Sequence, residues 1–108
     1  MAKYMLQISY TSESWKAMTA KPVNRAETVG PAIEKMGGKL EGLWLAFGKH
    51  DLFALVDWPD NASAAGFSIA VAAGGGVKSM LTTPLMTPEE GMEAMRKAGS
   101  SAYKAPGS

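Results

Sequence analysis

The sequence predicts an α+β domain that has a four-stranded antiparallel sheet with both main helices on one of its faces. Four short segments alternate between apolar and polar side chains with the period of two that is typical of strands. Segments with helical spacing and recognisable capping residues separate these strands. The 108 residues, 46% hydrophobic and 19% charged, suffice for one modest core and are too apolar for disorder.

The first strand is predicted at residues 4–10, where four apolar side chains share one face. A helical region follows over residues 11–36, and its Thr-Ser start supplies an N-cap. Pro22 is expected to interrupt this region, because proline lacks a backbone donor and clashes with the preceding turn. The pair Gly37–Gly38 is expected to end it, since glycine readily adopts the left-handed conformation of a helix stop.

Two further strands are predicted at residues 39–48 and 51–58, and Gly48 permits a tight turn that joins them as an antiparallel hairpin. A helix rich in alanine then begins after an Asp-Asn pair that offers an N-cap, and the glycines at 74–76 end it. The small side chains of this helix allow it to lie close to the sheet.

The fourth strand is predicted at residues 77–85 and is followed by a short helix. The helix start is marked by Thr87 as N-cap, Pro88 at the first helical position and Glu90 three residues after the cap. Together these residues form a capping box, which is a strong signal of a helix N-terminus.

The order β-α-β-β-α-β followed by a helix is the ferredoxin-like pattern. The sequence therefore predicts a ferredoxin-like domain over residues 1–86, a C-terminal helix over residues 87–98 and a flexible tail over residues 99–108. In this fold the helices cover one face of the sheet and leave the other face open.

The two faces of the predicted sheet carry different side chains. The helix-facing layer is expected to contain Leu6, Ile8, Leu43, Leu45, Ala54, Val56, Val77 and Leu81. Phe47 is expected on the same side of its strand as Leu43 and Leu45. The opposite face is expected to contain Met5, Gln7, Ser9, Trp44, Phe53, Leu55, Asp57, Met80 and Thr82. This second face is too apolar for water, and the chain has too little left over to cover it. We therefore expect the protein to self-associate through it as a homodimer or higher oligomer.

The composition argues against several classes of function. The net charge is +1 and the 11 basic residues are scattered among 10 acidic ones, so nucleic acid is not an expected partner. The absence of cysteine and the single histidine argue against a metal site, and no cofactor is expected. No stretch approaches the about 18 consecutive apolar residues of a membrane helix, so we expect a cytoplasmic protein without a membrane partner.

Five short motifs follow one another along the chain. They are Y-T-S-E-S-W after the first strand, K-M-G-G-K-L at the end of the helical region, G-K-H-D in the hairpin, D-W-P-D-N-A-S-A-A before the alanine-rich helix and G-G-V-K-S-M-L-T-T-P-L in the last strand. In order and spacing they resemble the GYD domain family over about residues 3–90. Gly48, His50 and Asp51 match the motif that names the family, with His50 in place of its usual tyrosine, whereas Gly30-Pro31 departs from the usual pattern.

The resemblance implies a dimeric α+β barrel, in which two ferredoxin-like sheets pack face to face. The apolar second face leads to the same expectation without the resemblance. The wider architecture includes cofactor-independent monooxygenases, small isomerases, haem enzymes and proteins that only bind ligands, so the fold does not choose among these functions.

His50 and Asp51 are the candidate catalytic residues, because a histidine with an orienting carboxylate can act as a general base. A structural interpretation competes with this one, since neighbours in a strand point to opposite faces. In that interpretation His50 is an exposed turn residue or a subunit contact, and Asp51 accepts backbone N–H groups that pin the hairpin. Candidate ligand-binding residues, chosen as aromatic walls and placed polar groups, are Gln7, Ser9, Tyr10, Trp44, Phe53 and Thr82.

Three functions remain open at this point. The leading hypothesis is a small homo-oligomer that binds a small apolar molecule in or near the sheet–sheet interface. The alternative is a cofactor-independent monooxygenase or isomerase, in which His50 moves a proton and Asp51 orients it. The third is a structural oligomerisation module whose interior is packed solid.

Overall fold

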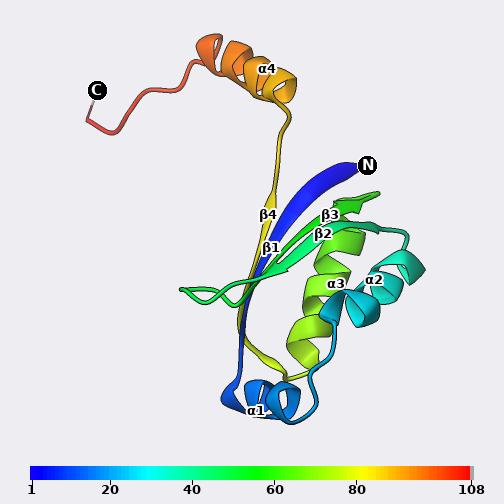
Figure 1. The fold of residues 1–108 in the computed structure, drawn as a ribbon. Helices are drawn as coiled ribbons and strands as arrows, with labels where there is room; N and C mark the ends of the chain where they lie inside the picture. Colours follow the sequence, from blue (N-terminus) through cyan, green and yellow to red (C-terminus); the bar gives the residue numbers. More distant parts are fainter. Residues whose placement is uncertain (108) are drawn as a thin grey trace.

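The computed structural model describes residues 1–107, and Figure 1 shows their arrangement. The elements are β1 (Ala2–Tyr10), α1 (Ser12–Ala20), α2 (Arg25–Lys35), β2 (Lys39–Leu45), β3 (Leu52–Trp58), α3 (Asn61–Ala73), β4 (Val77–Pro84) and α4 (Pro88–Gly99). This order, with one antiparallel sheet, confirms the predicted α+β class and its broadly ferredoxin-like pattern. The tail predicted at 99–108 ends in Ser108, which lies outside the described residues.

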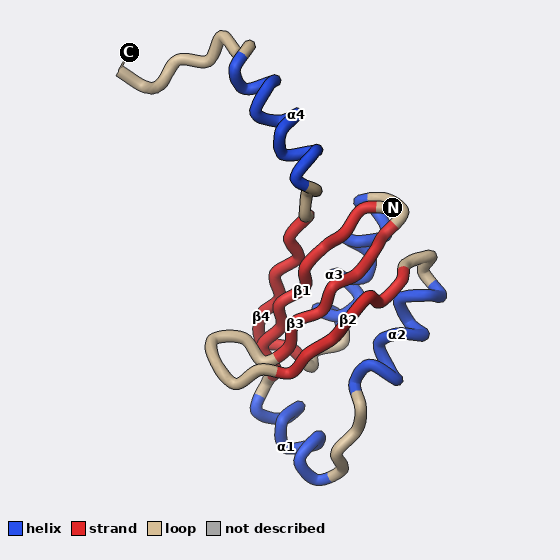
Figure 2. The backbone as a smooth tube through the Cα atoms, turned by 45° about the horizontal axis from the view of Figure 1, so that its top comes forward, coloured by secondary structure: helices blue, strands red, loops and turns tan. Residues whose placement is uncertain are grey.

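The four strands are hydrogen-bonded in the order β2-β3-β1-β4, and every pair is antiparallel. Helices α2 and α3 lie on one face of this sheet, and α1 lies at its lower end (Figure 1). In Figure 2, which is turned by 45° from that view, the sheet lies in front and α3 lies behind it. No helix of the part of the chain described here covers the side of the sheet opposite to α3, and we call it the open face.

The helix boundaries follow from local capping. The Thr11 side chain accepts the backbone N–H of Ser14 at the start of α1, and the Asn24 side chain caps α2 after the break at Pro22. Gly37 ends α2 with a φ of +86°, a left-handed conformation that glycine adopts without steric cost. The predicted interruption and stop of the helical region are therefore confirmed.

The core lies between the sheet and the helices. Alternate residues of the two central strands, β1 and β3, point into it, as the period-two pattern requires. Trp58 is completely buried, and its ring lies 5.5 Å from that of Phe67 on α3, measured between centroids. The buried apolar side chains are Tyr4, Leu6, Ile8, Tyr10, Ile33, Leu52, Ala54, Val56, Trp58, Ala64 and Phe67.

A β-bulge changes the phase of β4. Ser9 of β1 pairs with Ser79, whereas the next residue, Tyr10, pairs with Val77. Lys78 is therefore an extra residue in β4, with no partner of its own on β1. If side chains simply alternated from Val77 onward, each later residue of β4 would lie on one particular face; because of the extra residue, it lies on the other.

The predicted faces of three β4 residues are wrong for this reason. Leu81 was expected to face the helices but pairs with Gln7 on the open face. Met80 and Thr82 were expected on the open face but lie on the helix side, where the hydroxyl oxygens of Thr82 and Ser68 are 2.7 Å apart. Thr82 is consequently removed from the polar groups that could meet a ligand on the open face.

The hairpin between β2 and β3 also differs from its predicted form. Leu43 and Leu45 pair with helix-facing residues of β3, and Trp44 pairs with Phe53, so the predicted phase of β2 is confirmed. However, β2 ends at Leu45, and residues 46–51 form a loop instead of a tight turn. Phe47 was expected to continue the strand face of Leu43 and Leu45, and this prediction is wrong because the residue lies beyond the strand with its side chain fully exposed in the loop.

Helix α4 begins with the predicted capping box of Thr87 and Glu90. None of its residues is buried, and it projects from the end of β4 away from the rest of the chain (Figure 1). Its Met92 and Met95 side chains are exposed, as are Leu85 and Met86 in the segment that precedes it.

Candidate functional site

The open face carries a row of four side chains, one from each strand, that is apolar except for Gln7. Trp44 pairs with Phe53, Phe53 with Gln7, and Gln7 with Leu81. The adjacent row contains Leu55 and Met5, which also pair with each other. Trp44 is 57% and Leu81 49% exposed, so the two ends of the row are uncovered. An apolar surface of this kind is typical of a contact or ligand surface.

Gly42 fixes how Trp44 lies on this face. A Cβ atom at Gly42 would come within 2.5 Å of the Trp44 ring, so the indole occupies the space that a side chain would fill. Both residues are on β2, two positions apart, and a bulge at Glu41 sets their phase. The indole therefore lies along the strand and broadens the apolar surface.

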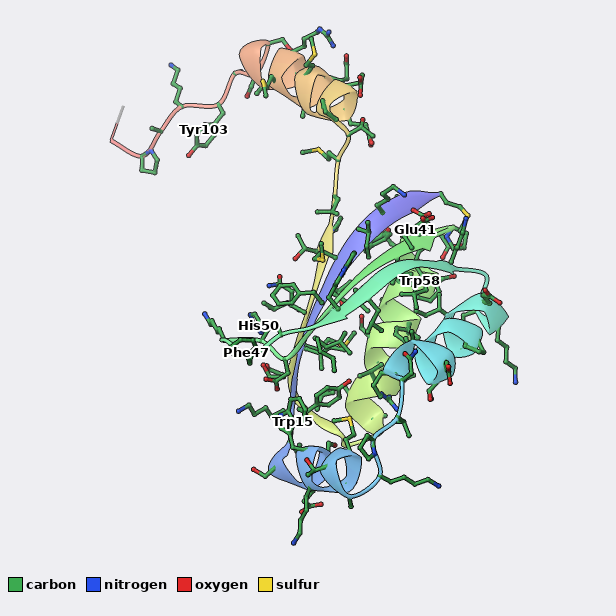
Figure 3. All side chains as sticks on the ribbon, viewed as in Figure 1. Trp15, Glu41, Phe47, His50, Trp58 and Tyr103 are labelled. Atoms are coloured by element: carbon green, nitrogen blue, oxygen red, sulfur yellow. The ribbon has the colours of Figure 1, made fainter. Side chains whose placement is uncertain are left out.

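His50 lies at the end of the open face nearest to the hairpin loop. Its Nδ1 atom is 3.4 Å from the Ser9 hydroxyl oxygen, and its ring meets that of Phe53 edge to face, with centroids 6.1 Å apart. Ser9 is 3% exposed and donates its hydroxyl to the Lys49 carbonyl at 3.2 Å. Figure 3 shows His50 and Phe47 on the same hairpin.

Asp51 makes different contacts. Its Oδ2 atom accepts the Tyr10 backbone N–H at 2.8 Å and the Trp15 indole N–H at 3.3 Å. Tyr10 and Trp15 also meet edge to face, with ring centroids 5.4 Å apart. Within residues 1–107 no hydrogen bond joins His50 to Asp51. The carboxylate instead ties the start of β3 to the end of β1 and to α1.

The fold, the hairpin motif and the aromatic residues together invite comparison with known families. The profile of the GYD domain family matches residues 4–95, which is most of the chain. This protein belongs to the GYD domain family. No curated protein matches the sequence.

In this GYD domain the candidate site residues fall into two groups. Gln7, Ser9, Trp44, Phe53 and His50 gather on the open face, where apolar walls adjoin a few polar atoms. The remaining candidates face elsewhere: Tyr10 is buried on the helix side, Thr82 bonds to Ser68, and Asp51 bonds to Tyr10 and Trp15.

The opposite end of the open face carries charges. Lys3 and Asp57 pair across β1 and β3, with Nζ and Oδ1 3.0 Å apart, and Glu41 lies within 4.0 Å of both Lys3 and Lys39. The hydrogen bond with Glu41 and then the one from Lys3 hold the pKa of Asp57 below its ordinary value. The same bond to Asp57 raises the pKa of Lys3. This cluster limits the apolar surface at that end.

Residues 1–107 contain no group of three or more histidine, cysteine, aspartate or glutamate side chains placed to share a metal ion. Among the same residues no helix combines the length and apolar character needed to cross a membrane.

The sequence interpretation missed Arg25. It follows Asn24, the N-cap of α2, and lies on the same side of the helix as Val29 and Ile33, four and eight positions later. The Arg25 Nε atom is buried and has no hydrogen-bond partner within the described residues. The sequence did carry a signal for this position: Arg25 is spaced four and eight residues from Val29 and Ile33, which places its side chain on the buried side of an amphipathic helix.

Proposed function

We propose that this GYD domain self-associates through the open face and binds a small apolar molecule at that face. The observation that carries the proposal is the row from Trp44 to Leu81, which crosses the whole sheet. The large apolar side chains at its two ends are each about half exposed to water. Burying such side chains against a second copy removes apolar area from water, at roughly 25 cal/mol per Å².

A second copy is a suitable cover because none of residues 1–107 covers this face. Helix α4 projects away from the sheet, and its methionines give further adaptable contact surface. Identical surfaces related by a two-fold axis meet each other, so one apolar face can serve both copies.

The ligand hypothesis depends on the mixed character of the same face. Gln7, Ser9 and His50 offer polar atoms beside the aromatic rings of Trp44 and Phe53. Ligand pockets are mostly apolar and contain a few such placed polar groups. A molecule held between two open faces would contact the rings and orient a polar end toward Ser9 and His50.

Light scattering with size-exclusion chromatography tests the self-association. We expect the wild-type protein to elute as a dimer or larger species at micromolar concentration, and Trp44→Lys or Leu81→Lys to shift it toward the monomer. Ile69→Lys is the matched control, because Ile69 is 68% exposed on α3, on the other side of the sheet. A monomeric wild-type protein rejects the proposal, and so does an equal effect of all three substitutions.

Native mass spectrometry of freshly purified protein tests the ligand. We expect a bound mass in the oligomer that is lost in Trp44→Lys. Oligomer peaks that carry only the protein mass, together with an interface that a crystal structure shows to be packed solid, would favour the purely structural module instead.

A second candidate function is proton transfer by His50 in an enzyme without a cofactor. The observation that favours it is the contact between His50 Nδ1 and the buried Ser9 hydroxyl, which can fix the imidazole orientation. In this version Ser9 takes the orienting role that the sequence suggested for Asp51. His50→Gln should abolish any turnover while leaving self-association intact, and unchanged turnover would exclude His50 from the chemistry.

A further inference from the structure

A cavity lies on the helix side of the sheet, away from the open face. Its outer part, of about 360 Å³, lies between α1, the start of α2 and the end of α3, and an inner part of about 50 Å³ continues toward the sheet. The two parts share Tyr10, Arg25, Val71 and Val77. The outer volume falls within the range of small-molecule sites, roughly 300–1,000 Å³.

The walls of this cavity are apolar apart from a few groups. Deep apolar side chains from β1, β3, α2 and α3 line the inner part, and they include Leu6, Ile8, Val29, Leu52, Ala54 and Phe67. Ala17, Met18 and Ala70 line the outer part. An apolar body of several carbon atoms therefore matches most of the lining.

Arg25 is the charged group of the cavity, and its position there is unusual. Its Nε atom is buried without an acceptor, and no carboxylate of residues 1–107 lies within 4.0 Å of its guanidinium. The residue as a whole is only partly buried, and a buried donor without a partner is uncommon in folded proteins. The guanidinium presents a planar fork of donors that matches a carboxylate in geometry as well as in charge.

We propose that this cavity binds a small apolar carboxylic acid, with the carboxylate on Arg25 and the hydrocarbon body along the apolar walls. The terminal N–H groups of the Arg25 guanidinium are accessible and have no partner within residues 1–107, so they can donate to the carboxylate. The hydrocarbon body fills space lined by Met18 and Val71. Tyr10, like Arg25, lines both parts of the cavity.

The neighbouring glycines argue for a carboxylate and against a phosphate. The Gly74 and Gly75 N–H groups are already bonded to the carbonyls of Ala70 and Ala72, so they offer no cradle of free donors. The Ser14 hydroxyl donates to the Gly76 carbonyl at 2.7 Å, so it is not free to donate to a phosphate. One guanidinium in an apolar setting suits a singly charged ligand.

The site is independent of the self-association proposed above. It lies on the opposite side of the sheet and is lined by one copy of the chain, so it does not need a partner. A Trp44→Lys protein that has become monomeric should bind the acid as well as the wild type does. Loss of binding at the cavity and failure of self-association can therefore be told apart.

The experiment titrates the full-length protein with octanoate carrying a ¹³C-labelled carboxyl group and, in parallel, with octan-1-ol as the neutral analogue. We expect octanoate to bind more tightly than octanol and its ¹³C resonance to shift on binding. Arg25→Met should weaken octanoate binding by about ten- to a hundredfold, the loss of hydrogen bonds to a charged group, and should leave octanol binding unchanged. Arg96→Met, on the exposed helix α4, is the matched control and should change neither affinity.

A second variant keeps the test decisive if Arg25→Met folds poorly. Ala17→Trp places a large ring in the outer part of the cavity and should block octanoate and octanol alike. The proposal is rejected if wild-type protein does not bind octanoate at millimolar concentration, if octanol binds as tightly as octanoate, or if Arg25→Met or Ala17→Trp, once shown to be folded, binds octanoate with wild-type affinity.

Discussion

The Asp51 carboxylate accepts the backbone N–H of Tyr10 at 2.8 Å, although the residue beside it in the chain is His50. This bond and the one from the Trp15 indole join the start of β3 to β1 and α1, which lie 36 to 41 positions earlier in the chain. His50 and Asp51 are neighbours in the chain, but at the start of the strand their side chains contact different groups. Asp51 supports the fold, while His50 borders the open face through Ser9 and Phe53.

Removing the Asp51 carboxylate should destabilise the protein. Asp51→Ala leaves the Tyr10 N–H without its acceptor and should lower the free energy of unfolding by about 1–3 kcal/mol. Asp51→Asn keeps an oxygen that can accept this bond and should cost less. Urea unfolding followed by circular dichroism measures both changes. Glu34→Ala, at an exposed position of α2, is the control, and its change should stay within about 0.5 kcal/mol. Equal stability of Asp51→Ala and the wild type would contradict the tying role.

A methyl group at Gly38 should be poorly tolerated. A Cβ atom there would lie 2.6 Å from the ring of the buried Trp58 and 2.9 Å from the Asp57 carbonyl oxygen, and neither can move freely. Gly38→Ala should therefore lower the free energy of unfolding by about 1–3 kcal/mol or more, as overpacking does. Gly48→Ala is the matched control, because nothing lies within 4 Å of its added Cβ. The measurement is again urea unfolding, and a similar midpoint for the two variants would show that the packing around Gly38 yields easily.

Element type and order could be predicted because they depend on local signals. The caps at Thr11 and Thr87, the stop at Gly37 and the period-two alternation of β1 and β3 act over a few residues. The family resemblance depended on similarly local motifs, and the match over residues 4–95 confirms it.

What could not be predicted depends on pairing between distant segments. The extra residue Lys78 arises from the register of β4 on β1, and it moves Leu81 and Thr82 to the faces opposite to those expected. The partner of Asp51 is likewise chosen by a strand 41 positions away. Arg25 could have been noticed from its helical phase with Val29, but the absence of a partner for its Nε atom only emerges from the packed structure.

A methyl group at Gly42 should change the open face more than the stability. The Cβ atom would meet the far end of the exposed Trp44 ring at 2.5 Å, and this side chain can rotate away. We expect the free energy of unfolding of Gly42→Ala to lie within about 1 kcal/mol of the wild-type value, because the exposed Trp44 side chain can relieve the clash by changing its rotamer. In a ¹H–¹⁵N spectrum, only one of the three tryptophan indole signals should shift strongly, and Trp44→Phe identifies it. Large shifts of all three signals would indicate a general rearrangement and contradict this expectation.

The charged cluster at the far end of the open face should make stability depend on pH. The pKa of Asp57 is held below its ordinary value of about 4, so its ionised form is the one that the fold favours. The contribution of Asp57 to the free energy of unfolding is present at pH values above its ordinary pKa. It is lost as the pH falls through the lowered pKa of the folded protein. The pKa of Lys3 is raised, so its contribution is present below its ordinary value, about 10.4, and is lost as the pH rises through the raised one.

We therefore expect wild-type protein to be more stable than Asp57→Asn between about pH 5 and pH 9, with a gap that shrinks as the pH falls from about 4 toward 2. Urea unfolding midpoints measured across this range give the gap directly. Glu89→Gln is the control, because the exposed Glu89 carboxylate on α4 lies outside the cluster. The difference in stability between this variant and the wild type should not follow the pH dependence seen for Asp57→Asn. High salt should also narrow the gap at neutral pH, since it screens exposed charge pairs. A gap that stays constant from pH 7 to pH 2 would show that Asp57 acts through packing and not through its charge.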